Sequence, residues 1–459
     1  ETLLATSPEA VPPFLKSLSG VLDRITISQL DSWFHRGVDL LKDNPESGIA
    51  FFKVESNTSV AMLETLSSSL ELDRVKGIIR LYCSALSGSS IDVLDTQELV
   101  RKNIGWVDED SAATDGTKVF LPTIVDHYPD KQDNFSWFKV VSTHQVGHLE
   151  FGSFLFDFTK PSGLFDDRRF PLEEDVNAGK QAAEEGFEPT QSLTDIGRFL
   201  SLFQDRQLAF DLFTVLEDCR LDYRIKVEYP GIRRAANRVQ DEALANRPNI
   251  QEMGVQEALV ELLIHMSLEQ FTELPVPIEY KDAAVVLAQI LHELRNAQAE
   301  VEDTAEATLR AYEIISRITK ENPPEEDWEQ EDLEEPGDFS EEEYESLIDQ
   351  LQAGQDASGE SGEGESRESP EPVDYRGDFK PEMVQLLTRL QSDQDQQGEG
   401  EPISQEMLEQ LLQESSELEL DAEQGDINDS MSAFAQNLMK EAGTPPPNSQ
   451  PGQGYGPLL

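Results

Sequence analysis

Two histidines four residues apart are the residues of this sequence best placed to do chemistry. His144 and His148 belong to the run His-Gln-Val-Gly-His, and their spacing puts both imidazoles on one face of a helix. The same face carries Trp137, Val141 and Phe151, so we expect both rings to point into the core. Two ring nitrogens presented to a common point can bind a tetrahedral zinc ion. A helical scaffold without metal, in which both histidines are plain core residues, is the alternative interpretation.

The residue after the first histidine decides which chemistry a metal could support. In zinc peptidases with the pattern HExxH, this residue is a glutamate that acts as the general base on water. Here the position of the catalytic base is occupied by Gln145. A neutral amide can hold a water molecule but cannot take its proton, so we expect hydrolysis to fail or to be very slow. Either the base was lost naturally, or an active zinc peptidase of the gluzincin type was silenced by engineering.

A zinc site also needs a third protein ligand. Six residues after His148 stands Phe154, which cannot coordinate a metal, and this excludes the metzincin subclass. In gluzincins a glutamate from a later helix completes the site. Glu217, which follows an apolar run, is the best candidate. We therefore expect one zinc ion per chain, held by His144, His148 and Glu217.

Acidic and basic side chains alternate after Glu217. On a helix Glu217, Arg220 and Arg224 share a face, so the arginines could orient the carboxylate or bind an acidic ligand. A solvent-facing set of helix ion pairs is the alternative. The basic patch could also hold the acidic tail. The residues expected to support the metal ligands or to bind a ligand are Asp218, Arg220, Asp222, Arg224, Arg233 and Arg234.

Helices must position these residues, and the sequence predicts a mainly α protein in three parts. Apolar residues at helical spacing predict a helical bundle over residues 1–105. Residues 106–321 should form a zincin-like helical core, with one or two short strands in the β-branched run 117–125. Residues 322–459 read as a largely disordered acidic tail. Short amphipathic helices are expected within it, near 383–390, 407–412 and 434–439.

The charge balance excludes several classes of function. The chain of 459 residues has 36 basic and 91 acidic residues, a net charge of −55, and residues 301–459 alone hold 42 acids and 8 bases. This repels phosphate groups, so we expect no binding to nucleic acid or to anionic membrane surfaces. The longest apolar stretches, such as residues 283–291, are too short to cross a bilayer, so we expect no membrane insertion. Two cysteines without a CxxC pairing suit a reducing, cytoplasmic location. No Walker A pattern is present, so ATP hydrolysis by this chain is not expected.

Three runs of sequence carry a resemblance to a known family. HQVGHLEFGSF followed by VLEDCRLDYRIKVEYPGI resembles the N-terminal region of NorD-like and CbbO-like proteins, and DYRGDFKPEMVQLL supports this more loosely. Such proteins end in a von Willebrand factor A domain with a DxSxS motif, which does not occur here. The resemblance implies an adaptor or chaperone that works with a MoxR-type AAA+ ATPase to remodel or activate a target metalloenzyme. It also implies His144, His148 and Glu217 as metal ligands, and natural loss of the base at Gln145.

Overall fold

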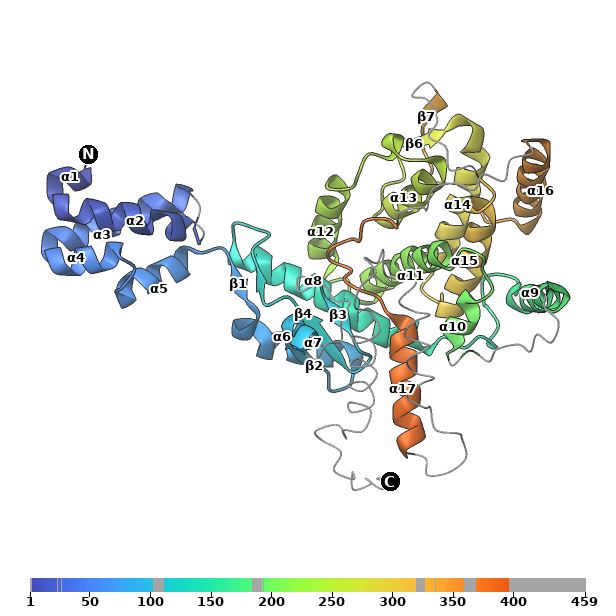
Figure 1. Ribbon diagram of the computed structural model, residues 1–459, viewed down its shortest axis with the longest axis horizontal. Helices are drawn as coiled ribbons and strands as arrows, with labels where there is room; N and C mark the ends of the chain where they lie inside the picture. Colours follow the sequence, from blue (N-terminus) through green and yellow to red (C-terminus); the bar gives the residue numbers. More distant parts are fainter. Residues whose placement is uncertain are drawn as a thin grey trace. The chain divides into compact units, whose positions relative to one another are not determined.

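The structure, a computed structural model, describes residues 2–22, 24–25, 27–101, 111–183, 192, 194–318, 327–334, 336–358 and 369–395. Over these residues the chain is mainly helical with a few short strands, which confirms the predicted class (Figure 1). Internal contacts divide the chain into two units. The first comprises Glu1–Gly77 and Thr123–Phe138, and the second Ile78–Pro122 and Lys139–Leu459.

The first unit is a helical bundle around an aromatic core. Trp33, Phe51 and Phe52 are completely buried, and their ring centroids lie 5.3 to 5.9 Å apart. Asn44 begins a helix because its side-chain oxygen accepts hydrogen bonds from two backbone amides of the first turn. Its first segment ends at Gly77, whereas the expected helical region extends to residue 105, and Thr123–Phe138 form its second segment. Its elements are α1 (Thr2–Thr6), η1 (Pro8–Ala10), α2 (Val11–Leu22), α3 (Ile27–Asp43), α4 (Pro45–Phe52), α5 (Asn57–Leu66) and the antiparallel pair β1 (Leu70–Glu71) and β5 (Ile124–Val125).

The second unit is built around a long buried helix, α11 (Arg206–Glu228). Asp205 begins this helix by accepting a hydrogen bond from the amide of Leu208. Helices α13 (Val255–Ser267), α14 (Lys281–Leu294) and α15 (Val301–Ile315) pack against it. Two further helices, α6 (Leu72–Ser87) and α8 (Lys131–Glu150), contain the boundaries between the units. The remaining helices of this part are α7 (Thr96–Arg101), η2 (Ser153–Leu155), α9 (Arg169–Ala183), α10 (Asp195–Leu200), α12 (Arg233–Ala245), η3 (Ile250–Glu252) and η4 (Ile278–Tyr280).

The second unit also contains a small sheet. Its order is β2 (Asp92–Asp95), β4 (Lys118–Leu121) and β3 (Ala113–Thr114). The central strand β4 is parallel to β2 and antiparallel to β3. The strands β4 and β5 confirm the prediction of short strands in the run 117–125. Because β3 lies at an edge of the sheet, one side of its backbone is open to pairing with another segment.

Part of the expected acidic tail belongs to the folded second unit. Strand β7 (Trp328–Glu331) pairs with β6 (Leu274–Pro277), and α16 (Glu341–Ser358) packs on α14 and α15 with Tyr344 completely buried. Helix α17 (Pro381–Asp395) packs on α10 and η2. It contains the residues 383–390 for which a short helix was predicted. The expected linker over 322–459 is therefore interrupted by packed elements, because a few spaced apolar residues dock on an existing core. The helices expected near 407–412 and 434–439 lie outside the described residues.

Two predictions about the environment of the chain can be compared with the structure. Within the part of the chain that the structure describes, no helix is both long and apolar enough to cross a bilayer. Cys83 and Cys219 are buried free thiols. Burial raises the pKa of both thiols to about 12, so they remain protonated and unreactive.

Candidate metal centre

Helix α8 carries both histidines into the interior of the second unit. Every residue from 140 to 148 is buried, so this part of the helix is enclosed on all sides. A polar side chain in such a place is costly unless it finds a hydrogen-bond partner. Thr143, for example, lies 2.7 Å from the hydroxyl of Tyr82. The hydrogen-bond partners of His144, Gln145 and His148 therefore indicate the role of this part of the helix.

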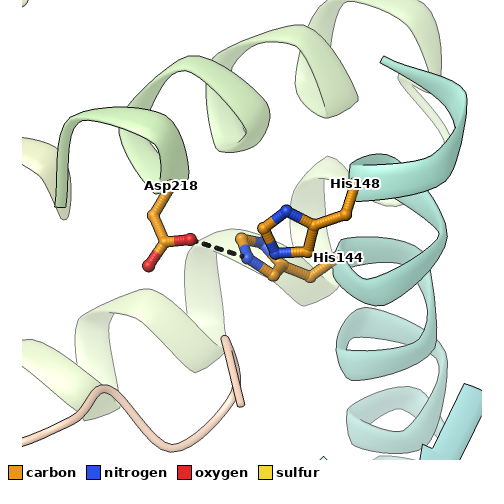
Figure 2. A group of neighbouring side chains, drawn as sticks. All are labelled: His144, His148 and Asp218. Atoms are coloured by element: carbon orange, nitrogen blue, oxygen red, sulfur yellow. Dashed lines mark hydrogen bonds and ion pairs between the residues drawn. The ribbon is translucent and has the colours of Figure 1, made fainter. Parts of the chain in front are cut away.

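The two imidazoles lie close to the carboxylate of Asp218 on α11 (Figure 2). One ligand atom from each of His144, His148 and Asp218 can be chosen so that all three lie within 4.8 Å of one another. His144 Nε2 is 3.2 Å from Asp218 Oδ1, and the two imidazole centroids are 5.0 Å apart. Both histidines are only 1% exposed, which confirms their predicted inward face. We call these three residues the His-His-Asp cluster.

The hydrogen bonds around His148 leave one ring nitrogen ready to bind a metal. A carboxylate only accepts, so Ser153 donates its hydroxyl proton to Glu217 Oε1 at 2.5 Å. Ser153 Oγ then accepts from His148 Nδ1 at 3.1 Å, which leaves the lone pair on Nε2. This buried Nε2 has no hydrogen-bond partner among the described residues. Burial, together with the positive charges of His144 and Arg220, lowers the pKa of His148 well below its ordinary value, so the ring is neutral.

His144 lies between two carboxylates. Its Nδ1 is 3.0 Å from Asp222 Oδ1, and its Nε2 faces Asp218. Burial disfavours the charged ring, but the two aspartates outweigh burial and raise the pKa of His144 to about 9. A carboxylate that accepts from the far nitrogen of an imidazole is the usual way to orient a metal-binding histidine. A metal at Nε2 would have to displace a proton from the ring.

The carboxylate beside the imidazoles belongs to Asp218 and not to Glu217, the residue predicted for this place from the sequence. Glu217 is completely buried, and both of its oxygens already accept hydrogen bonds. Arg220 and Ser153 donate to Oε1, and Arg220 and Thr304 donate to Oε2. Burial opposes the charge, but Arg220 holds the pKa of Glu217 below its ordinary value. Neighbouring residues on a helix point about 100° apart, so only one of the two carboxylates can face α8.

Gln145 uses its amide in a way that a carboxylate could not. Its Nε2 donates a hydrogen bond of 2.6 Å to the backbone carbonyl of Arg376. A glutamate ionised at this position would bring one acceptor against another. The amide is therefore the side chain that suits this place in the fold.

The arginines expected to form one basic patch fall into two groups. Arg220 is completely buried, and Arg224 is half-buried; both donate to the backbone carbonyl of Ala299. Arg233 and Arg234 are exposed on α12, and Arg233 Nε donates to a backbone carbonyl of α11. The inner pair supports the core beside the cluster, and the outer pair is available to a partner.

A segment within the predicted acidic tail supplies further residues to the site. We call residues 369–380 the strap; it leads into α17 (Figure 1). Arg376 donates to Asp222 Oδ2 from Nη2 at 2.9 Å and from Nε at 3.1 Å, and Tyr375 donates to the same oxygen. Phe379 stacks on an imidazole of the cluster with the centroids 4.4 Å apart. The one signal in the sequence was the run Tyr-Arg-Gly-Asp-Phe, which is aromatic and basic in an acidic region.

Comparison with known proteins adds no assignment. No family model, no curated protein and no solved structure matches this chain. The resemblance to NorD-like and CbbO-like proteins therefore stays a prediction.

The residues of the cluster fit a metal ion. Two imidazoles and one carboxylate are a common donor set for a three-ligand metal site. Zinc-to-nitrogen bonds of this kind are about 2.0 to 2.1 Å, which places tetrahedral ligand atoms about 3.3 Å apart. The atoms of the cluster, all within 4.8 Å, need only small side-chain movements to reach that spacing. The Nε2 of His148, which has no hydrogen-bond partner among the described residues, gives the cluster an atom that is free to bind a metal.

Proposed function

We propose that this chain is an adaptor with a zinc-binding, gluzincin-like core that does not cleave peptides. In this proposal it works with a MoxR-type AAA+ ATPase to remodel or activate a target metalloenzyme. The observation that carries the metal part is the bare Nε2 of His148, buried beside His144 and Asp218. The ATPase and target parts rest on the sequence resemblance alone.

Zinc is the metal that the donor set favours. Imidazole nitrogens and a carboxylate suit zinc, and three protein ligands leave one position open. His144, His148 and Asp218 would hold the ion, while Asp222 and Ser153 orient the two imidazoles through hydrogen bonds. When bound, zinc would act as a Lewis acid at the open position.

The amide of Gln145 supports a role without hydrolysis. It cannot accept the proton that a general base must take. Its Nε2 also donates a hydrogen bond to the backbone carbonyl of Arg376, which an ionised glutamate could not do. This favours a natural glutamine over an engineered replacement.

Replacement of Gln145 by glutamate separates the adaptor from the alternative, a zinc peptidase of the gluzincin type that was silenced at this position. We expect Gln145→Glu to lower the free energy of unfolding by about 1–3 kcal/mol, because a buried acceptor then lacks a donor. We expect no hydrolysis of unfolded substrates. Urea denaturation and a fluorogenic peptide library measure the two effects, with Gln298→Glu as an exposed control. Zinc-dependent hydrolysis at unchanged stability would establish the peptidase instead.

Arg233 and Arg234 give the partner part of the proposal a direct test. They are exposed arginines in a chain of net charge −55, so a partner with an acidic surface would meet them. Reversal of both to glutamate should weaken capture of a co-expressed MoxR-type ATPase about tenfold at low salt, and less at high salt. Lys16→Glu with Arg36→Glu in the first unit makes the same change in net charge. Equal capture by all three proteins, or equal loss in both double variants, would reject a role for this pair.

A further inference from the structure

The strap binds the second unit through its backbone as an added strand would. The amide of Asp378 donates to the carbonyl of Ala112 at 2.7 Å, and Asp378 forms a parallel bridge with Ala113 of the edge strand β3. Extended peptides dock on sheet edges in this way. Gly377 has a φ of 70°, and a Cβ there would lie 2.2 Å from the Ala112 carbonyl oxygen. The close approach of the two backbones therefore depends on glycine at this position.

The side chains of the strap fill polar places beside the cluster. Arg376 is 2% exposed and binds Asp222 and both the hydroxyl and the carbonyl of Ser267. Its Nε also lies 3.8 Å from Asp218 Oδ2. The Tyr375 hydroxyl donates to Asp222 and is itself 3.1 Å from the amide of Gln240. The strap thus binds the carboxylate of Asp222 with two neighbouring side chains, those of Tyr375 and Arg376.

The strap also covers the cluster. The ring of Phe379 lies nearly parallel to that of His148, at an angle of 11°, and is 7% exposed. The backbone carbonyl of Arg376 accepts a hydrogen bond from the side-chain amide of Gln145. A ligand larger than an ion that approached from this side would have to displace the strap.

A cavity of about 360 Å³ adjoins this arrangement. Gln240 lines it and also contacts Tyr375 and Asp222, and the lining includes Asp241, Glu269 and Glu334. Glu269 already pairs with Lys226 and Arg295, so Asp241 and Glu334 supply the negative charge that would complement an arginine of a bound peptide.

We propose that the strap is an intramolecular stand-in for a partner: it occupies a surface that binds an extended, arginine-containing peptide of another protein. The surface consists of the edge strand β3, Asp222 with Ser267, and the face of His148. An arginine from a partner would make the same ion pair that Arg376 makes. After such an exchange the buried carboxylate of Asp222 would again have a cationic partner, which avoids the cost of a buried unpaired charge. This inference goes beyond the proposed function and does not depend on zinc or on the ATPase.

A steric change releases the strap without altering any charged residue. Gly377→Ala places a methyl group against a backbone oxygen at a left-handed position, so the strap should detach. Gly231→Ala is the matched control, because a Cβ there meets nothing within 4 Å. The first readout is cleavage by trypsin after Arg376, followed by mass spectrometry. We expect at least tenfold faster cleavage at this bond in Gly377→Ala than in the other two proteins.

The second readout is binding of a fluorescent peptide with the sequence of residues 370–380 to the full-length proteins, with chelator present throughout. Gly377→Ala should bind this peptide at least tenfold more tightly than the wild type and Gly231→Ala, and should not bind the same peptide with its arginine changed to alanine. If Gly377→Ala fails to fold, Arg376→Gln provides the same comparison with the glycine retained. Faster cleavage without tighter binding, or equal binding of both peptides, would overturn the proposal. Zinc content and ATPase capture do not enter this experiment, so the proposed function can fail while the inference stands.

Discussion

Replacement of His148 by alanine is expected to empty the metal site and to lower the thermal stability of the protein. The bound zinc should fall from about one ion per chain to almost none, because the imidazole of His148 is one of only three protein ligands in the proposed site. A metal that binds only the folded state stabilises it by about 2.7 kcal/mol at a free concentration one hundred times the dissociation constant. This contribution should disappear with the imidazole. Metal analysis and thermal melts with and without zinc measure both effects.

His292→Ala is the control for this experiment. His292 is exposed on α14, so its loss should change neither the zinc content nor the melting temperature. Chelation should lower the melting temperature of the wild type and of His292→Ala, but not that of His148→Ala. Wild-type protein that carries no zinc when purified without chelator, together with a melting temperature that zinc does not raise, would leave the helical scaffold without metal as the correct interpretation.

The part of the site that lies on one helix could be predicted from the sequence. The positions of His144 and His148 on α8 follow from the helical period, and the apolar residues around them indicate which way the rings point. The amide at Gln145 and its inability to act as a base follow from residue type. These inferences are local, and each depends on a few neighbouring residues.

The choice between Glu217 and Asp218 could not be made in this way. Both carboxylates follow the same apolar run, and the rotation of α11 about its axis decides which one faces α8. That rotation is set by packing against α13, α14 and α15. Arg220 and Thr304 take up the oxygens of Glu217 and leave Asp218 to the histidines. Contacts between distant segments therefore decide the third member of the cluster.

The docking of the strap could not be predicted from the sequence for a related reason. Gln145 and Arg376 are 231 residues apart in the chain, and the segment around Arg376 has the average composition of a linker. Averages over a long window conceal a short run that docks through a few side chains. Tyr375, Arg376 and Phe379 are buried, while Glu371 and Asp374 remain exposed. Glu371 and Asp374 therefore do not oppose docking of the strap, and the half-buried carboxylate of Asp378 accepts a hydrogen bond from the hydroxyl of Ser111.

Glu217→Gln and Asp218→Asn, the same conservative change at adjacent carboxylates, are expected to give opposite results. Asp218→Asn removes a ligand, so the affinity for zinc should fall by more than the 10- to 100-fold that loss of an orienting group costs. Glu217→Gln should still bind about one zinc at saturation. It leaves the guanidinium of Arg220 buried without its carboxylate, which should lower the free energy of unfolding by about 3–5 kcal/mol. Zinc titration and urea denaturation, the latter with chelator present, separate the two effects.

A second change shows whether the loss in Glu217→Gln arises from the buried charge. Removal of one partner of a buried ion pair is costly, whereas apolar replacement of such a pair is often tolerated. Addition of Arg220→Met to Glu217→Gln should therefore recover part of the lost stability, while Arg220→Met alone should destabilise the protein. In the double variant, the amide oxygen that replaces the Glu217 carboxylate can still accept a hydrogen bond from the hydroxyl of Ser153. The Nε2 of His148 should therefore stay free to bind zinc, and the zinc should remain bound. Zinc bound by Asp218→Asn but absent from Glu217→Gln would reverse this assignment and make Glu217 the third ligand, as the sequence alone predicted.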